Sequence, residues 1–345
     1  MTQAVSKPVV AVFGATGHTG RFVVAELLRR NMTPVAIARN AQVLEGTDFG
    51  SPEVIRRHAS VDDAASLDKA FEGAQAVINC AGPFADTARA VAEAALRAKA
   101  HYVDVCAEQG AAKNTLDMFN EAARKAGVVV VPSVAFYGGL ADLLASAALG
   151  DWDAADTIEI MIGLDSWHPT RGTRITVDRK AVGNLVVSGG KLVPGEQPQQ
   201  KQWDFGEPLG DQTLVEVPFS EPILISRHIR ANEVRNYLSQ IAVQDVLNST
   251  TPTPKAVDDQ GRSSQRFVID VVVTRDDEQR GVSVYGHDIY AASAPLVCEA
   301  VTRLLRGEFA AGGTYTPGEI FDARDFLVSV DLGYSATENH SDVMA

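Results

Sequence analysis

The chain has 345 residues, of which 46% are hydrophobic and 22% are charged, and its formal net charge at pH 7 is −13. This length favours two domains, and the composition is typical of a folded globular protein. The negative charge argues against nucleic acid as a partner, because a phosphate backbone would be repelled on average.

Cysteine usage and apolar runs exclude further classes. The three cysteines, Cys80, Cys106 and Cys298, form no CxxC pair, which argues against a disulfide framework and against a structural zinc site. No apolar run approaches the roughly 20 residues that span a bilayer, and the first residues lack the apolar core of a signal peptide. We therefore expect a soluble cytoplasmic protein with no metal and no membrane partner.

The first predicted strand and helix enclose a glycine-rich turn. An apolar run at 9–13 precedes the turn, and apolar residues at helical spacing follow it at 21–30. A strand, a glycine turn and a helix in this order are typical of the first crossover of a dinucleotide-binding sheet. Free backbone N–H groups at a helix N-terminus attract a pyrophosphate, although three glycines can also simply make a tight turn. The expected cofactor-binding residues are Gly14, Ala15, Thr16, Gly17, His18, Thr19 and Gly20.

Strands and helices go on alternating to about residue 132. The predicted strands lie at 33–38, near 54–61, and at 74–79, 101–105 and 128–131, with helices at 64–71, 87–98 and 113–126. This alternation predicts an α/β fold with a doubly wound parallel Rossmann sheet.

The second half follows a different pattern. The elements that we predict there are a helix at 140–149, a strand at 158–164, a hairpin with an exposed loop at 189–210, strands at 213–219 and 222–226, a helix or strand at 237–247, a hairpin of 266–274 with 281–285, and helices at 291–306 and within 317–330. We expect the tail from residue 335 to be disordered. These elements predict a second α+β domain with a mixed, mostly antiparallel sheet.

The predicted domain organisation has three parts. A Rossmann domain covers 1–135, a substrate and dimerisation domain covers 136–310, and a C-terminal segment, 311–345, packs back on the Rossmann domain. A homodimer is one expectation, because antiparallel sheets in such second domains often pair across a dimer.

The end of the second strand bears on the choice of cofactor. A dinucleotide without a 2′-phosphate favours an acidic residue there, whereas this chain has Arg39 followed by Asn40. An arginine can pair with a 2′-phosphate in bidentate fashion and stack on adenine. We therefore expect NADP, bound as NADPH, rather than NAD; the alternative is a solvated arginine. Asp62 follows the third strand and is a candidate for the adenine amino group, although aspartate is also common in such turns.

The fourth strand ends in Cys80-Ala81-Gly82-Pro83-Phe84. Ligands of open α/β sheets bind outside the carboxyl ends of the strands. Ala81 and Gly82 are small enough for the backbone to approach the nicotinamide ribose, and Pro83 stiffens the turn. We assign all three to cofactor binding, with an ordinary strand-to-helix turn as the alternative.

Several segments together resemble a known family. They are 14–20, 79–84, 101–108, 132–144, 286–290 and 312–317. In this order they make the chain resemble the short saccharopine dehydrogenase-like oxidoreductases. The resemblance implies an N-terminal NADP-binding domain and a second α/β domain inserted before the final segments. The chain departs from the family pattern at Ala107, where glycine is usual, and at Phe136-Tyr137-Gly138-Gly139, where an Asp-Ser-x-Pro run is usual.

Three residues are candidates for the substrate side. Glu108 would lie beside the nicotinamide and orient substrate or hold a proton, or it would be an acid at a helix N-terminus. Tyr137 would line the pocket or donate a hydrogen bond. Arg174 would bind a substrate carboxylate or lie on the surface, and Asp142 is a candidate helix cap. No residue is assigned as catalytic.

These observations favour an NADP-dependent oxidoreductase. A hydride would pass between the nicotinamide and a C=N, C=O or C=C bond of a small molecule, with the cofactor carrying the chemistry. No tyrosine is followed four residues later by a lysine, which argues against the mechanism of short-chain dehydrogenases, and the second half argues against an atypical relative of them. A non-catalytic NADP-binding regulator or scaffold is the alternative.

Overall fold

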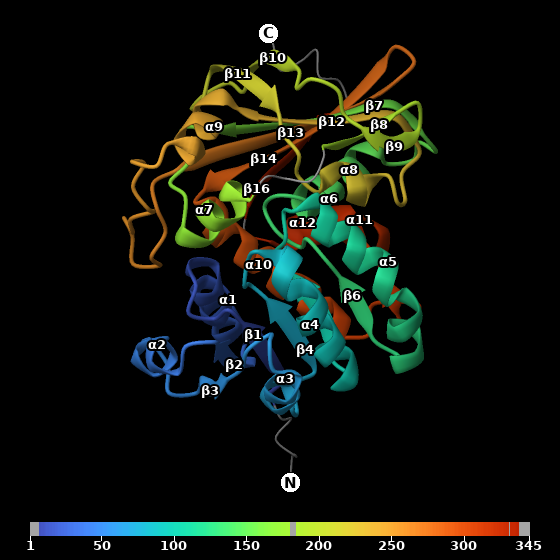
Figure 1. Cartoon of the computed structure of the whole chain (residues 1–345). Helices are drawn as coiled ribbons and strands as arrows, with labels where there is room; N and C mark the ends of the chain where they lie inside the picture. The colour runs from blue at the N-terminus through green and yellow to red at the C-terminus, as the bar shows by residue number, and fades with distance from the viewer. Residues whose placement is uncertain (1–6, 180–183, 331, 338–345) are drawn as a thin grey trace.

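The computed structural model describes residues 7–179, 184–330 and 332–337. Two sheets dominate it, and they lie at opposite ends of the molecule (Figure 1). The first is a seven-stranded parallel sheet in the order β15-β6-β5-β4-β1-β2-β3. Six of its strands come from the N-terminal part: β1 (Val9–Phe13), β2 (Thr33–Ala38), β3 (Ile55–His58), β4 (Ala76–Asn79), β5 (His101–Asp104) and β6 (Val129–Val131). The predicted Rossmann sheet is confirmed.

The helices between these strands complete the doubly wound fold. They are α1 (His18–Arg29), α2 (Ala41–Gly46), α3 (Ala64–Phe71), α4 (Phe84–Arg97) and α5 (Gln109–Ala126). From β1 the chain continues to β2 and β3 on one side, whereas β4, β5 and β6 lie on the other. The strand order therefore reverses between β1 and β4, which is where ligands of such sheets bind.

The second sheet has nine strands and is mixed. Its main order is β10-β11-β12-β7-β13-β14-β16, with β8 and β9 beside β12, and β12–β7 is the parallel pair among its described strands. The strands are β7 (Ala155–Leu164), β8 (Leu185–Ser188), β9 (Lys191–Pro194), β10 (Gln200–Asp204), β11 (Asp211–Glu216), β12 (Ala231–Ser239), β13 (Arg266–Arg275), β14 (Glu278–His287) and β16 (Gly333–Thr337). The expected mixed, mostly antiparallel sheet is confirmed.

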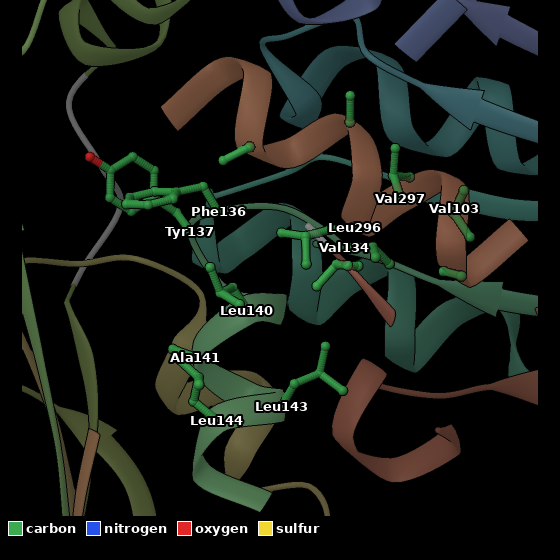
Figure 2. Close-up of a cluster of buried hydrophobic side chains, with 14 of the residues drawn as sticks. Val103, Val134, Phe136, Tyr137, Leu140, Ala141, Leu143, Leu144, Leu296 and Val297 are labelled. Atoms are coloured by element: carbon green, nitrogen blue, oxygen red, sulfur yellow. The ribbon is translucent and has the colours of Figure 1, made fainter. Parts of the chain in front are cut away.

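The remaining helices come from the second half of the chain. They are α6 (Gly139–Leu149), α7 (Arg171–Asp178), α8 (Glu221–Ile225), α9 (Gln240–Leu247), α10 (Ile289–Leu305), α11 (Pro317–Ile320) and α12 (Ala323–Ser329). Figure 2 shows Leu140 and Leu143 of α6 in the same cluster of buried apolar side chains as Val134, Leu296 and Val297. They belong to one continuous core. Within the described ranges, no helix combines the length and the apolar character that crossing a bilayer would require.

Two local predictions differ from the structure. The predicted strand at 222–226 is the helix α8, with Pro222 in its first turn, where a residue without an N–H is tolerated. The segment 237–247, for which helix and strand were both open, contains the end of a strand and a helix. β12 ends at Ser239 and α9 begins at Gln240. Leu238 pairs with Ile162 of β7 on one side and with Val215 of β11 on the other, so pairing between distant strands decides where this strand ends.

Helix α10 lies within the range predicted for the second domain, yet it packs against the first. Figure 1 shows α10 beside α1. Arg30 and Glu299 form an ion pair of 2.5 Å between them, and the thiol of Cys298 donates to the Val23 carbonyl at 3.8 Å. The chain therefore returns from the second sheet to cover the first.

The C-terminal segment contacts both sheets. β15 (Gly313–Thr314) adds to the edge of the first sheet beside β6, whereas β16 pairs with β14 of the second. The prediction of a disordered tail from residue 335 is therefore wrong for 335–337, which end β16 because its backbone finds an open strand edge at β14. The rest of that predicted tail, 338–345, lies outside the described residues.

Candidate cofactor and substrate site

The glycine turn after β1 has no room for side chains. Gly14 has a φ of +86°, and a Cβ built on it would lie 2.9 Å from the Cβ and the N of Ala81. A Cβ on Gly20 would lie 2.3 Å from the Gly14 carbonyl oxygen and 2.8 Å from Ala15 Cα. Helix α1 therefore packs directly on the turn, and the turn packs directly on the end of β4.

Three backbone N–H groups of the turn already have partners within the protein. The amides of Gly14 and Ala15 donate to the Ile37 carbonyl at 2.9 and 3.1 Å, and the Gly17 amide donates to Gly14 at 2.9 Å. Gly17 is the N-cap residue of α1, and no side-chain cap hydrogen bond forms at this end of the helix in the described chain. Since the first N–H groups of a helix have no partner inside it, the start of α1, from His18, fits an anionic pyrophosphate.

Arg39 lies at the end of β2 with an exposed side chain. Its carbonyl oxygen accepts a hydrogen bond from His58 Nε2 at 2.8 Å, and its guanidinium has no partner among the residues that the structure describes. Asn40 is differently placed, because its side chain caps α2 by accepting from the Val43 amide at 3.0 Å. Asp62, in the loop after β3, accepts a hydrogen bond from Ser60 at 3.3 Å. Arg39 is therefore the cation of this edge that is available to a phosphate.

The turn after β4 is held by polar contacts beneath it. The Ala81 amide donates to Asn79 at 3.0 Å, and the Thr87 hydroxyl donates to the Ala81 carbonyl at 2.6 Å. A Cβ on Gly82 would lie 3.6 Å from the Phe84 ring and 3.7 Å from Thr176 Oγ1 of α7. The backbone at Gly82 and Pro83 therefore faces a helix that belongs to the second half of the chain.

Glu108 lies at the N-terminus of one helix and contacts that of another. Its two carboxylate oxygens accept hydrogen bonds from the amides of Phe84, at 2.7 Å, and Ala85, at 3.2 Å. These amides open α4, a neighbouring helix, and Glu108 is also the first residue before α5. The carboxylate therefore compensates the N-terminus of α4 and at the same time lines a cavity.

That cavity has a volume of about 190 Å³ and opens at the carboxyl end of the first sheet. Its walls come from five places: α1 with the turn after β4, the segment after β5, the segment between β6 and α6, the segments around α7 and before α8, and the start of α10. The lining residues are Thr19, Cys80, Gly82, Phe84, Val105, Ala107, Glu108, Ala135, Phe136, Tyr137, Trp167, Thr170, Gly172, Thr173, Thr176, Val177, Phe219, Ile289, Tyr290 and Ser293. It is therefore a cleft between the two sheets at the predicted ligand edge.

Two of the three predicted substrate-side residues line this cavity, and the third does not. Glu108 and Tyr137 line the cavity, whereas Arg174 does not. The Arg174 guanidinium donates to the carbonyls of Asn248, at 3.2 Å, and Thr251, at 2.5 Å. It therefore ties α7 to the loop after α9. Residues 171–173 form the start of α7.

Aromatic side chains that sequence reasoning did not single out form one wall. The Tyr137 ring lies 4.3 Å from that of Phe219 and 5.4 Å from that of Trp167. The Tyr290 hydroxyl accepts from Trp167 Nε1 at 3.0 Å. Tyr290 belongs to the segment 286–290 that carries the family resemblance, so the sequence could have identified it as a site residue. No sequence pattern pointed to Trp167 or Phe219.

The two tyrosines of this wall differ in their hydrogen bonding. The Tyr290 hydroxyl also contacts Thr170 and Thr173, at 3.2 and 2.9 Å. The Tyr137 hydroxyl is buried and has no hydrogen-bond partner among the described residues. Burial raises the pKa of Tyr137 well above its usual value, so its hydroxyl keeps its proton. It is a donor without an acceptor.

His18 connects the glycine turn with this wall. Its ring packs edge-on against Tyr290, with the ring centroids 5.3 Å apart. Burial lowers the pKa of His18, so the imidazole is neutral near pH 7, and its Nε2 is buried without a partner in the described chain. His18, the first residue of α1, therefore joins the glycine turn to the aromatic wall of the cavity.

Asp104 organises the segment after β5. It is fully buried and accepts hydrogen bonds from the Tyr102 hydroxyl at 2.8 Å and from the amides of Cys106 and Ser133 at 3.0 and 2.7 Å. Burial raises the pKa of Asp104 to about 6, although these donors favour its charged form. The carboxyl joins the ends of β5 and β6 and thereby positions the segment that leads to Glu108.

A second buried carboxyl, Glu221, lies behind Tyr137. It accepts hydrogen bonds from the Gly138 amide at 2.8 Å and from Asn236 at 3.3 Å. Burial raises the pKa of Glu221 to about 7. This residue gives α8 a fixed contact with the start of α6.

We expect Glu221→Gln to remove part of the pH dependence of stability. The folded pKa, about 7, is above the reference value of 4.5, so the folded state keeps a proton that the unfolded chain has released. Stability therefore falls as pH rises through this window, by up to about 3 kcal/mol. Denaturant unfolding across the window should show a smaller fall for the variant, and an equal fall would contradict this assignment.

Comparison with known proteins agrees with this geometry. Residues 10–131 match the family model of the saccharopine dehydrogenase NADP binding domain. This part of the chain therefore resembles the NADP-binding domain of saccharopine dehydrogenases. The chain is 31% identical over 152 residues to a saccharopine dehydrogenase-like oxidoreductase of Rattus norvegicus, a match that covers 39% of this chain and 35% of the relative. The resemblance stated from the sequence is confirmed, and the match spans about a third of that relative's length.

Two further matches extend beyond the N-terminal domain. A lipid droplet localized protein of Caenorhabditis elegans is 24% identical over 249 residues, which are 63% of this chain and 58% of that protein. The apo saccharopine dehydrogenase (L-Glu forming) of Saccharomyces cerevisiae superposes with a TM-score of 0.65 at 13% identity, over 96% of this chain and 100% of that one. At this identity the match shows a shared fold.

Proposed function

We propose that this protein is an NADP-dependent oxidoreductase that transfers a hydride between the nicotinamide and a C=N, C=O or C=C bond of a small molecule. One observation carries the proposal. The turn at Gly14, which fits a pyrophosphate, and the cavity beside Gly82 lie at the same edge of the first sheet. A dinucleotide bound along that edge would bring its reactive end to the cavity.

When bound, the nicotinamide supplies the hydride, and the chain supplies binding, orientation and shielding from water. The start of α1 holds the phosphates, and Arg39 pairs with the 2′-phosphate. Glu108 keeps α4 and the turn at Gly82 in place through its two amide contacts. Apolar and aromatic side chains around the cavity exclude water from the reacting atoms.

The first test is binding, followed by turnover. Purified protein is titrated with NADPH and with NADH, and the nicotinamide fluorescence is followed. A broad panel of aldehydes, ketones, imines and enones is then mixed with the protein and NADPH, and loss of nicotinamide absorbance is measured. NADPH binding with oxidation by some compound supports the proposal. Binding without oxidation across the panel would favour the alternative, a regulator that senses the cofactor.

Arg39→Asp should weaken NADPH binding by about 10- to 100-fold and leave NADH binding nearly unchanged. The guanidinium is unpartnered in the described chain, and a charge-assisted pair with a phosphate contributes about 1.5–3 kcal/mol. Fluorescence titration with both nucleotides measures the two losses. Arg39→Lys is the matched control, because it keeps the charge without the bidentate geometry, and should lose less. Equal losses of affinity for NADPH and NADH would mean that Arg39 does not bind the 2′-phosphate.

The other sequence-based expectations stay predictions. We propose a small molecule rather than nucleic acid or membrane as the partner, a cytoplasmic location, and a homodimer formed through the second sheet. Sedimentation of the full chain over a range of concentrations tests the homodimer.

A further inference from the structure

We propose that the cavity selects uncharged, planar carbonyl compounds with an apolar body, and that the hydroxyl of Tyr137 holds the carbonyl oxygen. This inference rests on the proposed function and deepens it. It predicts that substrates carrying a carboxylate are rejected.

The shape of the wall is the first argument. Tyr137 packs with Phe219 and Trp167 on one side of the cavity, and Phe84 and Val177 also line it. Flat apolar and aromatic surfaces pack best against a flat apolar partner, in stacked or edge-on arrangements. These side chains come from four separate stretches of the chain, so their convergence is a property of the tertiary structure.

The charge of the wall is the second argument. Among the lining residues that the structure describes, Glu108 is the carboxylate, and lysine, arginine and histidine are absent. Three arginines lie on or next to α7, and none lines the cavity. Arg174 donates to the loop carbonyls of Asn248 and Thr251, and Arg179 pairs with Asp86 at 2.7 Å on the surface. Arg171, the first residue of the helix, is exposed. A substrate carboxylate would therefore enter an apolar site whose described lining has no cation and holds another negative charge, which is strongly unfavourable.

The hydrogen-bonding state of the wall is the third argument. The Tyr290 hydroxyl has its partners, and Ser293 both accepts from the Phe136 amide, at 3.1 Å, and donates to the Ile289 carbonyl, at 3.1 Å. Among the described lining residues, Tyr137 has the one buried side-chain polar atom that lacks a partner. A buried donor without an acceptor is unfavourable, so a ligand oxygen that accepts from Tyr137 would stabilise the site.

The reaction balances with this single donor. A hydride from the reduced nicotinamide adds to the carbonyl carbon, and the C=O π electron pair moves to the oxygen. That oxygen takes the proton of Tyr137, because an alkoxide is more basic than a phenolate. Once the alcohol has left the cavity, a proton from the solvent restores the tyrosine. One carbonyl, one hydride and one proton give one alcohol.

The test compares two aldehydes of matched shape, para-tolualdehyde and para-formylbenzoate. With the full chain and saturating NADPH, kcat/KM should be at least roughly 100-fold higher for para-tolualdehyde. A preference for para-formylbenzoate would overturn the inference and leave the oxidoreductase proposal standing.

Calorimetry keeps the inference testable when neither aldehyde is reduced. Both are then titrated into the protein–NADPH complex. Tighter binding of para-tolualdehyde supports the inference even though the proposed reaction has failed, whereas equal or tighter binding of para-formylbenzoate overturns it.

Substitutions on α7 test the charge argument directly. None of the described residues of this helix is buried, so it tolerates a lysine. Thr176→Lys places a cation on the cavity wall and should reduce the preference for para-tolualdehyde by about 10-fold. Ile175→Lys adds the same charge to the same helix at an exposed position outside the lining and should leave the preference unchanged. Equal effects of the two variants would contradict the argument.

Tyr137→Phe tests the donor. We expect kcat for para-tolualdehyde to fall by about 100-fold with little change in KM or in NADPH affinity. The denaturation midpoint should stay the same or rise, because the hydroxyl has no partner to lose. An unchanged kcat would show that Tyr137 is not the proton donor. A lower kcat together with a lower denaturation midpoint would also contradict the proposed role, because the loss of activity would then follow from a less stable fold.

Discussion

Gly20→Ala should abolish NADPH binding, with an affinity loss of more than about 100-fold. The added methyl would lie 2.3 Å from the Gly14 carbonyl oxygen and 2.8 Å from Ala15 Cα. Both neighbours are backbone atoms and cannot rotate away. Helix α1 would therefore shift from the turn and carry its N–H groups away from the pyrophosphate, and overpacking of this kind costs about 1–3 kcal/mol of stability.

Fluorescence titration with NADPH and denaturant unfolding measure the two effects of Gly20→Ala. Gly110→Ala is the matched control, because Gly110 is also in the first turn of a helix and its Cβ would meet no described atom within 4 Å. The control should bind NADPH as the unmodified chain does. If Gly20→Ala binds NADPH equally well, the glycine turn is not the pyrophosphate site, and the proposed function loses its main support.

Asp142→Ala should destabilise the fold by about 3–5 kcal/mol, the usual loss when one partner of a buried pair is removed. Asp142 is fully buried in α6. Its carboxylate contacts His228 Nε2 at 2.7 Å and accepts from the Gly318 amide at 2.7 Å. It therefore joins α6 to the residues after α8 and to α11, and alanine would leave both partners unpaired.

This loss should depend on pH. Burial by itself would lower the pKa of His228, but the charge of Asp142 and its hydrogen bond outweigh burial and raise it. The pair therefore contributes fully below about pH 6.5, the unfolded value, and its contribution is lost as pH rises through the folded pKa. The stability gap between the unmodified chain and Asp142→Ala should narrow in alkaline solution. Denaturant unfolding over a pH series measures the gap, and a constant gap would contradict a charged His228.

Some of the site could be predicted because local sequence determines it. The spacing of Gly14, Gly17 and Gly20 follows from what one turn between a strand and a helix requires. Arg39 could be singled out because its place at the end of a strand follows from the strand itself. The alternation of strands and helices up to residue 132 likewise follows from hydrophobic periodicity, which is a local property.

The substrate side could not be predicted in this way. Glu108 has the residue type expected beside a nicotinamide or at a helix N-terminus, and only the approach of α4 shows that its oxygens meet the amides of Phe84 and Ala85. Arg174 has the residue type expected of a carboxylate binder, and only the loop after α9 shows that its guanidinium is engaged. In both cases the partner lies in another part of the chain.

The amino-acid sequence by itself determined the Rossmann sheet, the glycine turn and the family resemblance, because steric limits at glycine and the periods of strand and helix act over a few neighbouring residues. The tertiary structure alone decided that α10 returns to α1, that 222–226 is a helix, and that Tyr137, Trp167 and Phe219 meet around one cavity. These features depend on pairing and packing between segments far apart in sequence, where the free energy comes from burial rather than from local conformation.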